Sequence, residues 1–138
     1  MTVELSTSKL HDVAHMGMRA TIGVIFIVHG FGKFGNPGFG GWISSMGIPA
    51  EMQIPIALAE FIPGIFLIFG IFTRISSSLL SIVMLGAIFL VKGASSLTGE
   101  GGYELDLILL AACLVIIVSG PGRISISHLI KKIPRVLQ

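Results

Sequence analysis

Four side chains that could take part in chemistry lie within or beside long apolar runs of the sequence: His29, Lys33, Glu60 and Glu104. An imidazole, an ammonium and carboxylates gathered at one level of a helix bundle can bind a polar ligand or transfer protons. Glu60 is the most informative, because an ionised carboxylate inside a membrane costs roughly 2.5–3.5 kcal/mol or more on insertion scales. We therefore expect Glu60 to face the interior of a bundle and to be paired or protonated.

The elements that must position these residues follow from composition and from the apolar runs. Of the 138 residues 53% are hydrophobic and only 12% are charged, whereas a soluble domain carries about 25% charged residues. Runs of roughly 20 apolar residues are long enough to cross a hydrocarbon core of about 30 Å as helices. The sequence predicts an all-α, polytopic membrane four-helix bundle in a single domain, 1–138, with spans at about 13–34, 53–73, 75–91 and 103–119.

The segments outside the spans predict surface elements. Four glycines and one proline in 35–42 argue against a regular element there, and Trp42 is suited to anchor in the headgroup layer. In the tail, 123–138, apolar and basic residues alternate at helical spacing. That pattern predicts a basic amphipathic helix on the membrane surface; the alternative is a loose basic tail held there by charge.

The distribution of basic residues predicts the orientation. Two of the nine, Lys33 and Lys92, fall at one side of the predicted membrane. The other seven fall at the opposite side, which the positive-inside rule places in the cytoplasm. We therefore expect a multi-pass protein of the cell membrane with both termini cytoplasmic. The seven are Lys9, Arg19, Arg74, Arg123, Lys131, Lys132 and Arg135.

Two helical stripes predict how the first two spans pack. Glu60, Gly64 and Arg74 share one face of the second span, and glycine on such a face permits close helix approach. A similar stripe on the first span ends at Lys33, with His29 beside it. Stacking the stripes would bring Glu60 near His29 and Lys33. The residues we expect to serve helix packing are Arg19, Gly23, Gly30, Gly64 and Arg74.

Glu104 and Asp106 open the last span two residues apart, so their side chains point about 200° away from each other. Only one of them can face the bundle. We expect Glu104 to do so, because three glycines before it let the loop fold over the site, and Asp106 to reach back toward the headgroups.

Two interpretations of the polar cluster stay open: it holds the helices together, or it handles a ligand or protons. Interhelical polar bonds in membranes average well under 2 kcal/mol, yet they can fix which helices pair. Scattered carboxylates with one histidine lack the spacing of a strong metal motif, so no metal site is predicted. The single cysteine, Cys113, lies in an apolar run and is expected to pack as a small hydrophobe. The expected partners are the lipid bilayer and other membrane subunits or further copies of the chain, and not nucleic acid.

The chain resembles the DoxX family of small four-helix membrane proteins from about Met18 to Ser127. No single motif is specific, but the ordered set at these spacings is. It comprises Arg19 with Gly23, His29-Gly30 with Lys33, Gly47-Ile48-Pro49, Glu60 with Gly64, Gly70 with Thr73-Arg74, Gly102 with Glu104, and Gly120-Pro121-Gly122 followed by Ser125.

This resemblance implies a link to membrane redox chemistry, because the family takes its name from a subunit of a thiosulfate:quinone oxidoreductase associated with a terminal oxidase. It implies no catalytic residues. The first reading is an accessory subunit of a quinone-linked redox enzyme, in which His29, Lys33 and Glu60 contact a bound quinone. The second is a non-catalytic subunit or scaffold of a larger complex. A small-solute transporter is the third, and four short spans without an inverted repeat leave little room for a pathway.

Overall fold

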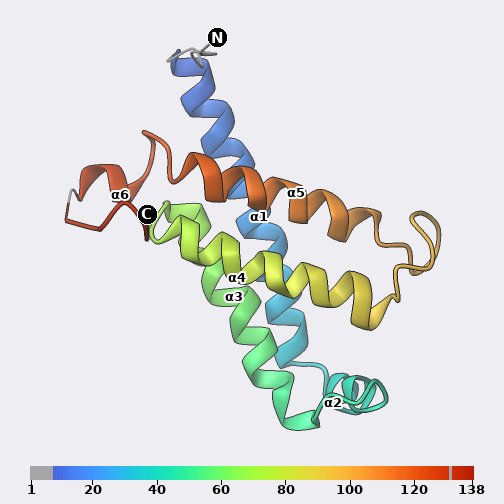
Figure 1. The fold of residues 1–138 in the computed structure, drawn as a ribbon. Helices are drawn as coiled ribbons and strands as arrows, with labels where there is room; N and C mark the ends of the chain where they lie inside the picture. Colours follow the sequence, from blue (N-terminus) through green and yellow to red (C-terminus); the bar gives the residue numbers. More distant parts are fainter. Residues whose placement is uncertain (1–7, 131) are drawn as a thin grey trace.

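The structure is a computed structural model that describes residues 8–130 and 132–138. These residues form helices and turns and contain no β-strand, which confirms the all-α prediction. Two antiparallel helix pairs make up the body, and Figure 1 shows the pair α1–α3 crossed by the pair α4–α5. The elements are α1 (Lys9–Phe34), α2 (Pro37–Ser44), η1 (Ala50–Met52), α3 (Gln53–Phe69), α4 (Thr73–Gly86), η2 (Ala87–Val91), α5 (Glu104–Ser119) and α6 (Ile126–Leu129).

The α1–α3 pair is held at main-chain distance by three glycines. A methyl group built on Gly23 would lie 2.6 Å from the carbonyl oxygen of Gly64, and one on Gly64 would lie 2.8 Å from that of Gly23. At Gly30 the nearest atom would be the carbonyl oxygen of Ala57, at 2.7 Å. No side chain fits at these distances, so the backbones touch directly, as small residues allow in membrane bundles.

The apolar core lies where the two pairs cross. Phe26 of α1, Leu67 of α3, Leu80 of α4 and Cys113 of α5 are all completely buried in it. The outer faces of the same helices carry many exposed large apolar residues, among them Val28, Ile82 and Val118. A chain with apolar side chains both inside and outside is typical of a bundle surrounded by lipid.

Arg19 joins α1 to the ends of two other helices. Its side chain is buried, with 1% of its surface exposed. Nε donates to the carbonyl of Leu67 at 2.6 Å, Nη1 to that of Pro121, and Nη2 to that of Ile124 at 2.8 Å. One guanidinium therefore supplies donors to carbonyls at the end of α3 and in the segment after α5, and so links these segments to α1.

Within residues 8–130 and 132–138, three helical stretches are long and apolar enough to cross a membrane: Lys9–Phe34, Ala50–Phe69 and Thr73–Val91. The second span ends earlier than the predicted residue 73, because Gly70 takes a left-handed conformation (φ 69°) that stops α3. α5 has 16 residues, which is about 24 Å of helix and less than a typical hydrocarbon core of about 30 Å.

The loop after α1 contains a helix that composition argued against. Asn36 caps α2 by accepting from the backbone N–H of Gly38 at 3.0 Å, and Pro37 occupies the first turn, where its missing N–H costs nothing. The side chains of Phe39 and Ile43, both in α2, are buried. Capping and burial together outweigh the low helix propensity of the glycines.

The amphipathic helix predicted for 123–138 is wrong in extent. Only Ile126–Leu129 is helical, capped by Ser125, and residues 130 and 132–138 form turns or irregular structure. Pro134 lacks a backbone donor, and its ring clashes with a helical carbonyl four residues earlier, so a helix cannot run through it. The main chain of this segment instead bonds to the bundle, through Ser127 N–H to Gly70 and Arg74 N–H to Gln138.

We predict that Gly23→Leu destabilises the bundle while Gly32→Leu does not. Leucine at Gly23 would overlap the backbone of α3, whereas nothing lies within 4 Å of a methyl group at Gly32. Overpacking typically costs about 1–3 kcal/mol and can cost more where the obstacle is backbone. Thermal unfolding in mild detergent, followed by circular dichroism, measures the difference. Equal stability of the two variants would contradict the close α1–α3 contact.

We predict that Arg19→Met lowers the free energy of unfolding by about 2–4 kcal/mol, because several carbonyls lose their buried donors. Arg19→Lys should recover only part of the loss, since one ammonium cannot reach all three carbonyls. The matched control is Arg123→Gln, whose side chain is 57% exposed and only loosely paired with Asp12 at 3.9 Å. If Arg19→Met and Arg123→Gln lost the same stability, Arg19 would not be the link described.

Candidate functional site

Lys33 and Glu60 form a buried ion pair between α1 and α3. Nζ of Lys33 lies 2.5 Å from Oε2 of Glu60, and the side chains are 20% and 4% exposed. The ammonium also lies 5.7 Å from the centre of the Phe39 ring, within cation–π range. Gln53 fixes the end of α1 by donating to the carbonyls of Lys33 and Asn36. The carboxylate is thus enclosed, while the lysine side chain stays partly exposed.

His29 lies one turn before Lys33 on the same side of α1, and its side chain is exposed. On the other side of α1, Phe31 and Phe34 pack against Phe61 of α3, with ring centres 6.5 and 5.9 Å apart. These aromatic contacts brace α1 against α3 next to Glu60. The structure therefore brings Lys33 and Glu60 together, with His29 nearby on the open side rather than inside the pair.

A second ion pair closes the α4–α5 hairpin. Nζ of Lys92 lies 2.5 Å from Oδ2 of Asp106 and also donates to the carbonyl of Gly102 at 3.0 Å. Asp106 is buried, whereas Glu104 is exposed. The structure reverses our expectation that Glu104 faces the bundle. Because α5 begins at Glu104, that carboxylate stays in solvent at the helix start, and the following turn directs Asp106 toward α4.

Two features concealed the Lys92–Asp106 pair in the sequence. The chain before Lys92 leaves α4 through the π-helical turn η2, where the N–H of Lys92 bonds to the carbonyl of Ala87 at 3.0 Å. Such a turn changes the direction of the side chains that follow it, and no sequence pattern marks it here. One sequence signal could have indicated the pair: a lysine, Lys92, ends one span, and acidic residues begin the next span.

The remaining predicted residues lie apart from these pairs. Gly23, Gly30 and Gly64 lie in the α1–α3 contact, and Arg19 at its opposite end. Trp42 is exposed on α2 and packs against Phe39, with ring centres 5.6 Å apart. Arg74 is half-buried at the start of α4. The predicted residues therefore divide into one polar cluster and several packing or surface positions.

The arrangement can do acid–base and hydrogen-bond chemistry. An ammonium and an imidazole supply donors, and a shielded carboxylate can accept a proton. In residues 8–130 and 132–138, no group of three or more His, Cys, Asp or Glu side chains could hold a metal ion.

Comparisons with known proteins find a matching family and similar membrane proteins. The DoxX family model matches residues 14–93. The chain is 33% identical over 114 residues to "Putative oxidoreductase CatD" of Bacillus subtilis, covering 82% of this chain and 84% of that protein. It is 30% identical over 130 residues to "Inner membrane protein YqjF" of Escherichia coli, covering 90% and 97%. No solved structure matches the chain.

These matches show the family to which the chain belongs, and the long apolar helices agree with a membrane protein. The family model covers more than half of the chain, and two relatives share at least 30% identity over most of their own length. The chain is a membrane protein that belongs to the DoxX family.

Proposed function

We propose that this protein is a four-span membrane subunit, with both termini in the cytoplasm, that assists a quinone-linked redox enzyme. The similarity to a protein named as an oxidoreductase supports a redox role. The observation that carries the proposal is the Lys33–Glu60 pair, in which the carboxylate side chain is 4% exposed and the lysine side chain 20% exposed.

Two features support the proposed topology: the apolar surface of α5 supports a fourth span, and the distribution of basic residues supports the orientation. α5 is apolar on all sides, and Leu107, Ile108 and Leu114 on it are exposed, as expected for a lipid-facing span. Tilt and local thinning of the bilayer can accommodate a helix shorter than the hydrocarbon core. In the sequence, seven of the nine basic residues precede or begin the first span, follow the second or follow the fourth, which favours a cytoplasmic position for these segments.

The residues around Lys33 fit a quinone headgroup. Such a headgroup offers carbonyl oxygens that accept hydrogen bonds, and on reduction it takes up two electrons and two protons. Lys33 and His29 are donors on the accessible side of α1. Glu60, behind Lys33, holds the ammonium in place and can accept or return a proton. The electrons belong to a redox centre of the partner enzyme.

A scaffold role is the second candidate. It is favoured by the Lys92–Asp106 pair, which resembles Lys33–Glu60 in length and joins a helix hairpin. If both pairs serve only to join helices, the chain is a non-catalytic subunit whose apolar outer faces contact other membrane subunits or a second copy.

We predict that wild-type protein purified in mild detergent carries lipid quinone, and that Glu60→Gln lowers the bound amount by about tenfold or more. The loss corresponds to one charge-assisted interaction of roughly 1.5–3 kcal/mol. Solvent extraction followed by chromatography measures the quinone. Asp106→Asn is the matched control, because it neutralises the other buried carboxylate, and it should keep the wild-type amount.

Two results would contradict the quinone proposal. One is equal quinone content in the Glu60→Gln and wild-type proteins. The other is a wild-type preparation that contains a stoichiometric protein partner and no quinone, which would support the scaffold role instead.

A further inference from the structure

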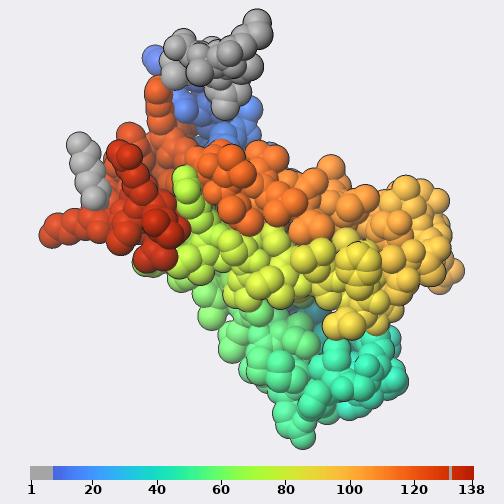
Figure 2. Space-filling model, in the orientation of Figure 1, coloured from blue at the N-terminus to red at the C-terminus, as the bar shows by residue number. Residues whose placement is uncertain are grey.

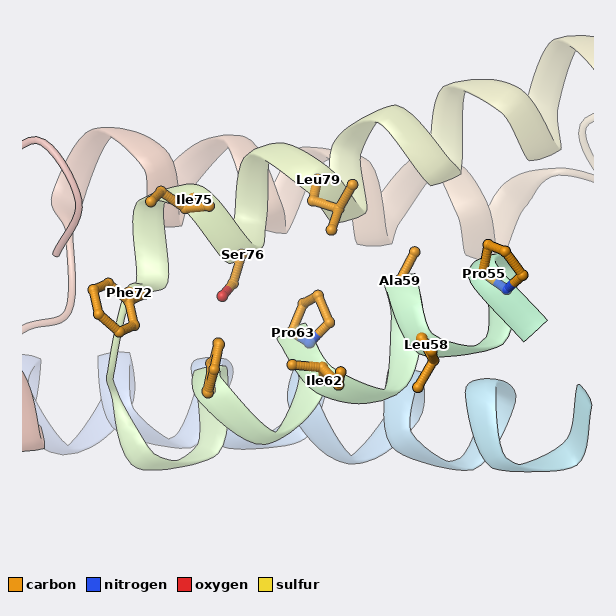
Figure 3. A pocket seen from close by; sticks show the side chains of 10 residues that line it. Pro55, Leu58, Ala59, Ile62, Pro63, Phe72, Ile75, Ser76 and Leu79 are labelled. Atoms are coloured by element: carbon orange, nitrogen blue, oxygen red, sulfur yellow. The ribbon is translucent and has the colours of Figure 1, made fainter. Parts of the chain in front are cut away.

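Two apolar furrows run along the outer side of α4. The first, of about 500 Å³, lies between α3 and α4 and is lined by residues such as Pro63, Phe66 and Leu79 (Figure 3). The second, of about 460 Å³, lies on the side of α4 toward α5. Both volumes fall in the range of roughly 300–1,000 Å³ typical of ligand clefts. Ile75 and Leu79 line both furrows and form the ridge between them.

The second furrow has a cationic end. Arg74 lines it together with Ile75, Ser78, Leu79, Ile82, Ile117 and Val136. Nε of Arg74 is buried and has no hydrogen-bond partner in the part of the chain that the structure describes, and none of the ion pairs formed there includes Arg74. A buried guanidinium N–H without a partner is costly. An anion bound at this edge of the apolar furrow would give that N–H a partner.

The surroundings of Arg74 add positive charge. Val136 lines the same furrow, which places the tail that carries Lys132 and Arg135 at its end. Figure 2 shows this tail beside the start of α4, whose length lies open on the same face of the molecule. The nearest acidic residue of α1, Asp12, is loosely paired with Arg123 at 3.9 Å.

We propose that this face of α4 binds an anionic phospholipid, with its phosphate on Arg74 and its acyl chains in the two furrows that flank the Ile75–Leu79 ridge. A lipid supplies what each part of the surface lacks: an anion for the guanidinium and hydrocarbon for the furrows. Arginine matches phosphate geometry through paired N–H donors. A soluble anion would leave the furrows unfilled, and an apolar helix would leave Arg74 without a counter-ion. The site is independent of the Lys33–Glu60 cluster.

The test is native mass spectrometry of the full-length, detergent-solubilised protein titrated with phosphatidylglycerol or phosphatidylcholine. Wild type is expected to retain phosphatidylglycerol preferentially. Arg74→Gln should weaken phosphatidylglycerol binding by about tenfold and remove the preference, and Arg74→Lys should keep part of it. Arg123→Gln removes a similar charge outside the furrow and should change binding less than about twofold.

Leu79→Trp tests the furrows separately, because it fills both while leaving Arg74 intact and replaces a residue already 38% exposed. It should lower phosphatidylglycerol binding without lowering the thermal stability of the protein. The proposal is overturned if Arg123→Gln and Arg74→Gln weaken binding equally, since charge alone would then explain it. It is also overturned if Leu79→Trp binds like wild type, or if inorganic phosphate displaces the lipid at equal concentration.

Discussion

The direct contact between the backbones of α1 and α3 is the interaction on which the rest of the structure depends. With no side chain between Gly23 and Gly64, the two helices keep a fixed register along their length. At one end of this contact the register places Arg19 against the carbonyl of Leu67, and at the other it places Lys33 against Glu60. In lipid a polar group without a partner costs several kcal/mol, so both polar contacts in turn hold the glycine contact in place.

The two ends of the bundle have different electrostatic characters as a result. At one end Arg19 bonds to neutral carbonyls, and Arg74 and the tail leave positive charge available to an external anion. At the other end each lysine has its own carboxylate. A paired ammonium and carboxylate can exchange protons with a ligand, whereas an arginine bound to carbonyls cannot, because arginine stays protonated. The proposed proton chemistry and the proposed anion binding would therefore lie at opposite ends of the bundle.

Much of the fold could be predicted from apolar runs and small residues, and these gave the three long helices and the glycine stripe that packs α1 on α3. Periodicity could also suggest that Glu60 and Lys33 share an interface. It could not choose between Glu104 and Asp106, because that choice depends on the residue at which α5 begins and on the π-helical turn before Lys92. The prediction of a long tail helix was wrong because it considered the hydrophobic spacing and left out Pro134. The prediction of no helix in 35–42 was wrong because capping and burial stabilise α2 despite its glycines.

Lys33 and Glu60 are proposed to serve ligand or proton chemistry in addition to joining two helices. A double-mutant cycle of Lys33→Met, Glu60→Gln and the doubly substituted protein measures it most directly, with unfolding stability and redox-dependent growth of cells recorded for each. Removing one partner leaves a buried charge, so both single variants should lose stability, and the neutral double variant should regain most of it. If the pair serves such chemistry, growth is not restored in the stable double variant. Recovery of growth together with stability would show that the pair only holds the helices together.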